Sequence, residues 1–167
     1  MDGDLTRVAG LEADYPNLVR VQENLADWNF AAFAKDAAMP AGIDAIRGRA
    51  VGLIRGWKIF ERAMAGAERV ISADDPEQLF RMLQLDRIEI ALYERSMGLE
   101  HIRKQGMKEV RVLEPPLYVR EMFIYLHRSN AGHAAKLASA LRAMKREGFY
   151  QRTYDEKLLP YLAKELK

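Results

Sequence analysis

The sequence predicts an α/β fold, in which short strands alternate with helices. Two apolar, β-prone runs, 50–54 and 88–93, are each followed at once by polar or aromatic residues. Around these runs, glycine, proline and capping residues mark off segments with helical periodicity. Strands that alternate with helices form a mainly parallel sheet with right-handed crossovers. We therefore expect a four-stranded, mainly parallel sheet within residues 49–113, flanked by three helices.

The first strand, 50–54, should lead into a helix over about 59–65. That helix ends before Gly66, because glycine readily adopts the left-handed conformation that follows a helix. Residues 69–72 are β-prone and are expected to form the second strand.

The second helix has the clearest start signal in the chain. Asp75 can cap it, Pro76 suits its first position and Gln78 can complete a capping box. Three apolar residues at helical spacing give this helix its buried face: Leu79, Phe80 and Leu83.

The third strand is expected at 88–93, and the third helix at about 96–105, before Gly106. The fourth strand should cover 110–113. Pro115 and Pro116 should then break regular structure.

The flanking segments give weaker patterns. Residues 1–24 look irregular, apart from a possible short strand at 18–21, and the aromatic run 28–34 fits either a strand or a buried helix. A fifth strand is expected at 122–127.

A long helix should start near Asn130 and end at Gly148, followed by a shorter helix over 155–165. Apolar residues at three- and four-residue spacing predict one buried face on the long helix. They are Ala134, Leu137, Ala138, Leu141 and Met144.

Length and composition exclude several function classes. The 167 residues suit one domain or two small lobes, and the formal net charge of +2 comes from interleaved acids and bases. A nucleic-acid binder would show a concentrated basic stripe, so no nucleic acid is expected as a partner. There is no cysteine, and the three histidines share no ligand spacing, so neither a metal nor another cofactor is expected.

No apolar run approaches the ~20 residues that span a bilayer. The start at Met1 is acidic and lacks the apolar region of a signal peptide. We expect a cytoplasmic protein if Met1 is the true start, and a periplasmic or extracellular one if a signal peptide precedes it.

Polar and aromatic residues follow the two main strands directly. Arg55 and Trp57 come after the first strand, Tyr93 ends the third, and Glu94 follows it. In an open parallel sheet, ligands bind outside the carboxyl ends of the strands. These four residues are therefore the first candidates for a binding site.

Several phrases, taken together with the order of elements, resemble the extracellular solute-binding proteins of polar-amino-acid ABC importers. The similarity implies the type II periplasmic-binding-protein fold and covers most of residues 1–155. The phrases lie at 50–56, 75–83, 86–94, 122–127 and 137–150.

The resemblance implies a complete lobe two at 37–117 and a partial lobe one at 1–36 and 118–167. The resemblance also implies that the chain begins in the middle of lobe one, so we expect a truncated form. A second departure lies after Gly56, where Trp57 and Lys58 replace the hydroxyl residues that hold an amino-acid carboxylate in typical members.

Each candidate site residue also has a structural interpretation. The resemblance implies that Glu94 pairs with a ligand's amino group, but it could be a solvated acid at a strand end. Gly56, Trp57 and Lys58 open a helix, where free N–H groups favour an anion, or they could form a turn packed on the sheet edge. Arg55 could grip a carboxylate or make a surface salt bridge.

Arg7 and Trp28 could face the same cleft from lobe one, although Trp28 also suits a core position.

Three functions compete. The first is a non-catalytic binding protein whose lobes close on a small polar solute, with an ABC importer membrane subunit as a possible partner. The second is a flavodoxin-like enzyme or receiver. The sequence argues against it, because it has neither the acidic residues that a receiver requires nor a nucleophile triad or glycine-rich phosphate loop. The third is a sensory or protein-interaction module that reuses this fold. We expect no enzymatic activity.

The apolar face of the long helix predicts self-association. An incomplete lobe one leaves this face short of cover, and an exposed apolar patch marks an interface. We expect a two-fold dimer through residues 1–36 and 118–167. The alternative is that the C-terminal helices fold back on the sheet of residues 49–113 as a monomer.

Overall fold

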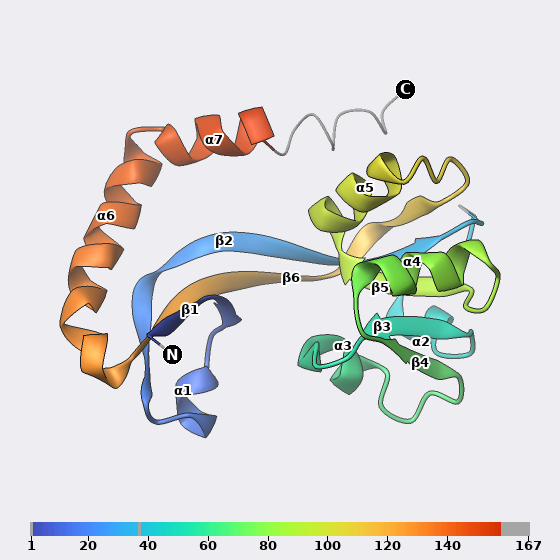
Figure 1. Cartoon of the computed structure of the whole chain (residues 1–167), viewed down its shortest axis with the longest axis horizontal. Helices are drawn as coiled ribbons and strands as arrows, with labels where there is room; N and C mark the ends of the chain where they lie inside the picture. Colours follow the sequence, from blue (N-terminus) through green and yellow to red (C-terminus); the bar gives the residue numbers. More distant parts are fainter. Residues whose placement is uncertain (1, 37, 158–167) are drawn as a thin grey trace. The chain divides into compact units, whose positions relative to one another are not determined.

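The computed structural model describes residues 2–36 and 38–157. Within them, six strands form one sheet in the order β1-β6-β2-β5-β3-β4. The chain divides into two compact units, residues 1–28 with 120–167 (unit 1) and residues 29–119 (unit 2). Figure 1 labels the helices and strands of both units. The α/β class predicted from the sequence is confirmed.

Unit 2 is built on three short parallel strands. They are β3 (Val51–Ile54), β4 (Val70–Ala73) and β5 (Ile90–Glu94). β3 lies between the other two, with Val51 opposite both Val70 and Ile90. The two apolar runs that predicted the fold are therefore neighbours in one sheet, as expected.

Two long strands pass from one unit into the other. β2 (Leu18–Ala34) includes the aromatic run, which is therefore a strand, and its end pairs antiparallel with β5. β6 (Arg111–His127) lies between β1 and β2. The expected fourth and fifth strands are both parts of β6, so the prediction of a four-stranded sheet confined to residues 49–113 is wrong.

The break predicted at Pro115 and Pro116 is also wrong, because both residues lie inside β6. Proline lacks the N–H that donates to a sheet, so it is tolerated in a strand where no donor is needed. The sequence shows the two prolines but not which sheet positions need donors.

The helices of unit 2 are α2 (Ile43–Ile46), α3 (Lys58–Ala63), α4 (Pro76–Gln84) and α5 (Arg95–Lys104). Three of them, α3, α4 and α5, follow the predicted boundaries closely, whereas α2 was not predicted. Asp75 caps α4 by accepting the backbone N–H of Gln78 at 2.7 Å. The Gln78 side chain accepts the N–H of Asp74 instead of that of Asp75. Gly106 directly follows the C-cap of α5 and has a φ of 64°, as a left-handed residue after a helix requires, and Gly66, in the turn after α3, has a φ of 80°.

An aromatic core joins α4 and α5 to the sheet. Phe33 and Phe80 are fully buried, and their rings meet edge-on at 5.2 Å. Gly98 of α5 lies against the Phe33 ring, so closely that an added Cβ would lie 2.2 Å from its Cζ atom. Only glycine lets α5 approach β2 this closely.

We predict that Gly98→Ala lowers the free energy of unfolding by about 1–3 kcal/mol, because the methyl group overpacks a rigid aromatic core. Urea denaturation measures the change. Phe33→Leu in the Gly98→Ala background should recover part of the loss by removing the clashing ring atoms. Gly48→Ala is the control, since nothing lies within 4 Å of its added Cβ. Equal stability of the Gly98→Ala and Gly48→Ala variants would contradict the predicted clash.

Unit 1 contains elements that the sequence did not predict. Residues 1–24 were expected to be irregular, but the structure has β1 (Gly3–Val8) and α1 (Leu11–Asp14) there. β1 pairs antiparallel with β6, with Gly3 opposite Leu126. Since its partner is more than a hundred residues away in the chain, local pattern gave little sign of β1.

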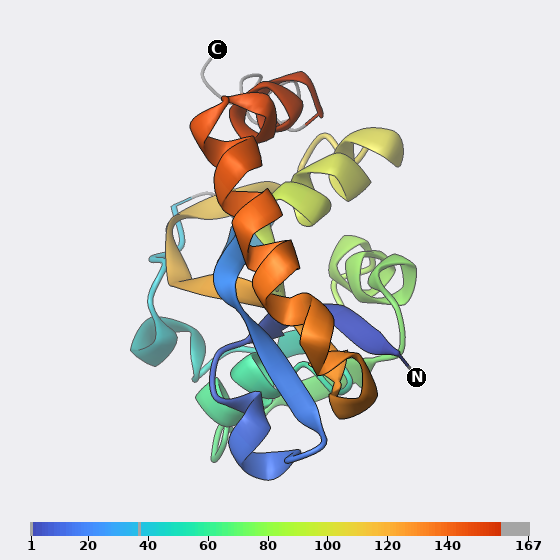
Figure 2. The ribbon, with the colours of Figure 1, turned by 90° about the vertical axis from the view of Figure 1, so that its left-hand side faces the viewer.

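The C-terminal part of unit 1 is helical. It comprises the 3₁₀ helix η1 (Arg128–His133), α6 (Ala134–Arg146) and α7 (Phe149–Lys157). The helix expected over 155–165 lies largely outside the described residues, and α7 begins earlier than the sequence predicted. Figure 2 shows α6 lying across β2.

The apolar face of α6 packs on its own unit. Ala138 and Leu141 are buried with Val21 of β2. Around them lie Leu25, Ile124, Leu126, Ala134 and Leu137, which are only partly buried. The predicted buried face of the helix therefore packs within unit 1, while Met144 stays 36% exposed.

A half-buried lysine fixes the far end of α6 to β2. The Nζ atom of Lys145 contacts Glu23 Oε1 and the backbone oxygen of Asn24, each at 2.7 Å. The same ammonium lies 5.8 Å from the ring centre of Tyr150. These contacts hold α6 and α7 against the strand.

Candidate functional site

Aromatic side chains gather where β3 and β5 end. Trp57 directly precedes α3, and its ring stacks on Tyr93, with ring centres 4.9 Å apart and an interplanar angle of 22°. Phe60 stacks on Trp57 from 6.0 Å, and Phe30 meets Trp57 edge-on at 6.1 Å. The structure therefore brings together Trp57 and Tyr93, two of the residues predicted from the sequence. Phe30 and Phe60 are buried, and Trp57 is half-buried.

The turn between β3 and α3 is already bound to a carboxylate of the chain itself. Gly56, with a φ of 86°, donates its N–H to Glu61 Oε1 at 2.8 Å. Lys58 Nζ lies 2.6 Å from Glu61 Oε2. The hydrogen bond from Lys58, and after it that from Gly56, lowers the pKa of Glu61 below its usual value. Glu61 therefore occupies the anion position that the sequence suggested at the start of this helix.

Arg55 makes a surface ion pair. Its Nε atom lies 3.0 Å from Asp74 Oδ1, and the two side chains are 67% and 71% exposed. This matches the alternative interpretation of Arg55 as a surface salt bridge.

Glu94 is the buried charged residue of the site, with only 4% of its surface exposed. Its side chain caps α5 by accepting the N–H of Met97 at 2.8 Å. Burial raises the pKa of Glu94, while the N–H groups of Met97, Ser96 and Asn29 oppose that rise. The solvated strand-end acid considered as its alternative does not match this environment.

Glu94 and Tyr93 lie on opposite faces of β5, because successive side chains of a strand alternate. Across the β2–β5 pair, Glu94 lies opposite Phe30 and Tyr93 opposite Ala31. Since cross-strand partners share a face, the Phe30 side chain lies on the same face of the sheet as Glu94. Its edge-on contact with Trp57 connects that face to the aromatic cluster. That Arg55, Trp57 and Glu94 line one cleft stays a prediction.

Two residues of this region were missed at the sequence level. Arg95, directly after Glu94, forms an ion pair with Glu114, with Nη2 2.7 Å from Oε1. Glu61 was the other omission, although an acid in the first turn of a helix was a usable signal. The Arg95–Glu114 pair joins two segments whose proximity depends on the fold, whereas the Glu61–Lys58 pair is local to the start of α3.

Arg7 and Trp28 belong to unit 1. The Arg7 guanidinium lies 2.7 Å from Asp4 Oδ2, and its side chain is 55% exposed. Trp28 is half-buried near the point where β2 enters unit 2. Their part in solute binding stays a prediction.

Among the described residues, no group of three histidine, cysteine or acidic side chains could hold a metal ion. His101 stacks on Phe80 with ring centres 4.8 Å apart, and burial lowers its pKa. Over residues 2–36 and 38–157, none of the helices has the length and apolar character needed to cross a membrane.

Comparison with known proteins gives structural relatives only. No family model matches the chain, and no curated protein matches its sequence. The GluR0 ligand-binding core, solved with L-glutamate, superposes with a TM-score of 0.81 at 11% identity. The match covers 92% of this chain and 69% of that one.

Two further solved structures agree with that match. The solute receptor for L-cysteine of Neisseria gonorrhoeae has a TM-score of 0.77 at 12% identity, covering 100% of this chain and 68% of that one. The amino acid ABC transporter substrate-binding protein AbpA of Streptococcus pneumoniae, bound to L-arginine, has a TM-score of 0.74 at 6% identity, with coverages of 94% and 66%. At these identities the similarity concerns the fold. The chain therefore has the type II periplasmic-binding-protein fold that the sequence resemblance implied.

Proposed function

We propose that this chain is a non-catalytic solute-binding module related to the substrate-binding components of ABC importers. The observation that supports it best is the half-buried Trp57, stacked on Tyr93 at the ends of β3 and β5. In open α/β sheets, this edge is where ligands bind. The solved neighbours hold L-glutamate or L-arginine, or are receptors for L-cysteine, so an amino acid or similar small polar solute is the proposed ligand.

The proposed roles follow from the contacts. Trp57 and Tyr93 cover the apolar part of the solute, and Glu94 supplies negative potential toward an amino group from its buried position. Glu61 already pairs with the Lys58 ammonium and accepts the N–H of Gly56, so a solute carboxylate would have to displace the Glu61 carboxylate. We therefore place the amino or cationic end of the solute in this unit, where an aromatic face also favours a cation.

Trp57→Leu should weaken binding of such a solute on the order of tenfold, the equivalent of one cation–π or stacking contact. Isothermal titration with L-arginine, L-glutamate and L-cysteine measures the affinity. Trp57→Phe keeps an aromatic ring and should retain most of the affinity. Leu85→Ala is the control, because Leu85 is 52% exposed on unit 2 and lies outside this site.

Binding that is unchanged in Trp57→Leu would remove the aromatic cluster from the site. The absence of binding to all three amino acids by the wild-type chain would remove the amino-acid class from the proposal. Circular dichroism of each variant checks that the fold persists.

The macromolecular partner that fits this function is the membrane subunit of an ABC importer, and the location that fits it is the periplasm or the cell exterior. The resemblance in sequence supports both. Fractionation of the expressing cells and cross-linking to the membrane fraction test them together.

A sensory or protein-interaction module is the second candidate. It is favoured by the internal partners of the charged groups at the site, since Asp74 holds Arg55 and Glu61 holds Lys58. A stable macromolecular partner that copurifies with the chain, together with the absence of solute binding, would favour this candidate.

A further inference from the structure

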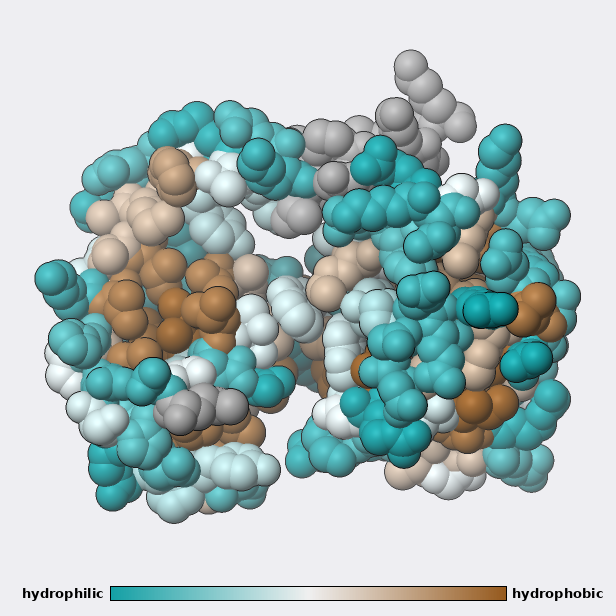
Figure 3. Space-filling model, in the orientation of Figure 1, coloured by the Kyte–Doolittle hydropathy of each residue, from teal (hydrophilic) through white to brown (hydrophobic). Residues whose placement is uncertain are grey.

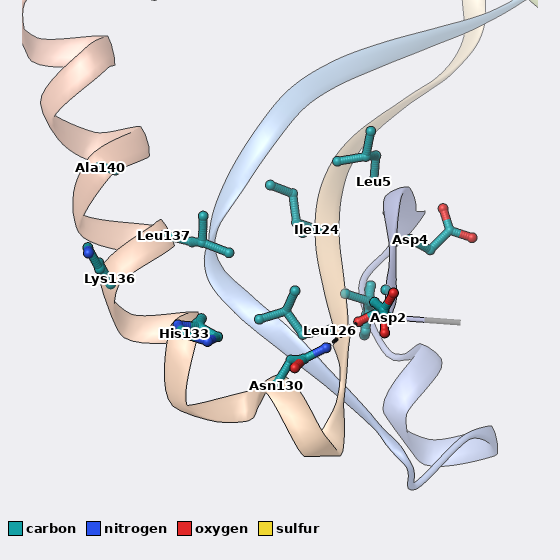
Figure 4. Close-up of a pocket in the computed structure, with 12 residues that line it drawn as sticks. Asp2, Asp4, Leu5, Ile124, Leu126, Asn130, His133, Lys136, Leu137 and Ala140 are labelled. Atoms are coloured by element: carbon teal, nitrogen blue, oxygen red, sulfur yellow. Dashed lines mark hydrogen bonds between the residues drawn. The ribbon is translucent and has the colours of Figure 1, made fainter.

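Unit 1 contains an apolar groove with a volume of about 610 Å³. Strands β1 and β6 form one wall, and η1 and α6 form the other. Figure 4 shows Leu5, Ile124, Leu126 and Leu137 pointing into the space between these walls. In Figure 3, hydrophobic side chains gather over this part of unit 1.

The β1 wall also presents a protruding apolar side chain. Leu5 is 67% exposed, although it lines the groove. β1 is the edge strand of the sheet, paired with β6. An exposed edge strand with an outward leucine is a surface that proteins normally cover.

The two walls have opposite charges at the rim. Asp2 lies on the β1 wall, and Lys136 lies on the α6 wall. The Asp2 backbone oxygen is held by the N–H of His127 at 2.9 Å, which fixes the residue at the rim. Within the described part of the chain, neither the Asp2 carboxylate nor the Lys136 ammonium forms an ion pair. The other acid of this wall, Asp4, is already paired with Arg7.

We propose that this groove is the contact surface between two copies of the chain, related by a two-fold axis through the groove. A rotation of 180° lays the β1 wall of each copy over the α6 wall of the other. Leu5 of each copy then enters the other's groove, and Asp2 of each copy faces Lys136 of the other. A surface that offers both the projecting side chain and its receptacle, and both charges, is complementary to itself. The contact closes as a dimer.

This inference concerns assembly, and it stands whether or not the site beside Trp57 binds a solute. The experiment is charge exchange followed by sedimentation equilibrium of the full 167-residue chain. Asp2→Lys alone places two cations together at both rims, and Lys136→Asp alone places two anions together. Each single variant should dimerise at least about tenfold more weakly than wild type, because like charges face each other twice.

Two combinations should restore the dimer. The double variant Asp2→Lys/Lys136→Asp has reversed but matched charges. An equimolar mixture of the two single variants should form a heterodimer in which both rim pairs are again complementary. Lys108→Asp is the control, with the same charge change at an exposed position of unit 2, and it should dimerise like wild type.

The apolar part of the contact has its own test. Leu5→Lys should abolish the dimer while leaving the fold intact, because Leu5 contributes little to the core of its own copy. A wild-type chain that stays monomeric, open-ended association, or a dimer indifferent to the single charge variants would each overturn the proposal. If the wild-type chain is a monomer that binds an apolar dye, and the Leu5→Lys variant no longer binds the dye, the groove is a site for an apolar ligand. That result would also overturn the dimer proposal.

Discussion

Phe80→Ala should lower the free energy of unfolding of unit 2 by about 3–5 kcal/mol, the cost typical of emptying a buried phenylalanine position. The Phe80 ring is fully buried and contacts three other rings, those of Phe33 at 5.2 Å, Tyr93 at 5.9 Å and His101 at 4.8 Å. Its removal leaves a cavity between α4, α5 and the sheet.

Urea denaturation followed by tryptophan fluorescence measures this loss. The chain has two tryptophans, Trp28 in unit 1 and Trp57 in unit 2. A Trp28→Phe background therefore restricts the signal to unit 2. Leu85→Ala, at a 52% exposed position, should change the stability by less than about 0.5 kcal/mol. A loss below about 1 kcal/mol for Phe80→Ala would mean that α4 is not anchored through this ring.

Glu94→Ala should lower the free energy of unfolding by about 1–3 kcal/mol, because it leaves buried N–H groups at the start of α5 without an acceptor. Glu94→Gln keeps an oxygen acceptor and should cost less than about 1 kcal/mol. In the proposed site, Glu94→Ala should also weaken the binding of amino or cationic solutes. Unchanged affinity for such a solute would leave Glu94 with only its capping role.

The same residue should give the chain a distinctive pH dependence. Burial raises the pKa of Glu94 in the folded state above its ordinary value of 4.5, so the native protein binds more protons than the unfolded chain between those two pKa values. The stability contributed by protonated Glu94 is therefore complete below about pH 4.5 and is lost as the pH rises through the native pKa.

Glu94→Gln removes the pH dependence of stability that Glu94 contributes. The difference in free energy of unfolding between wild type and this variant therefore isolates that contribution. Glu12, Glu61 and Glu89 have lowered pKa values and produce the opposite slope at lower pH, but they are common to both proteins. Unfolding curves recorded across the range from about pH 4 to pH 8 measure the difference. A difference that does not vary with pH would show that Glu94 is ionised at its ordinary pKa.

The sequence predicted the parts of the fold that are specified locally. Runs of apolar residues gave β3, β4 and β5, and the Asp75–Pro76 signal gave the start of α4 within one residue. These features depend on neighbours in the chain. β1 was missed because its pairing with β6 depends on a distant segment, and the continuity of β6 through Pro115 and Pro116 depends on which backbone donors the sheet uses.

The candidate site shows the same division. Position after a strand was enough to predict that Trp57 and Tyr93 lie together, as the stacked rings show. The partners that Lys58 and Arg55 have within the chain could not be deduced from residue type, since a cation suits an ion pair and a ligand equally well. The groove of unit 1 could not be predicted from the sequence, because its walls come from segments far apart in the chain, residues 2–5, 124–126 and 130–140.

The chain order of the two units affects how the protein emerges during synthesis. Unit 2 is one continuous segment, 29–119, and all of its residues leave the ribosome before the second half of unit 1. β1 must wait for its partner, since Gly3 pairs with Leu126. Closing so long a loop is entropically costly and slow compared with the local pairings of β3, β4 and β5. The nascent chain therefore carries β1 unpaired, with the apolar Leu5 exposed, until the residues around Leu126 have been made.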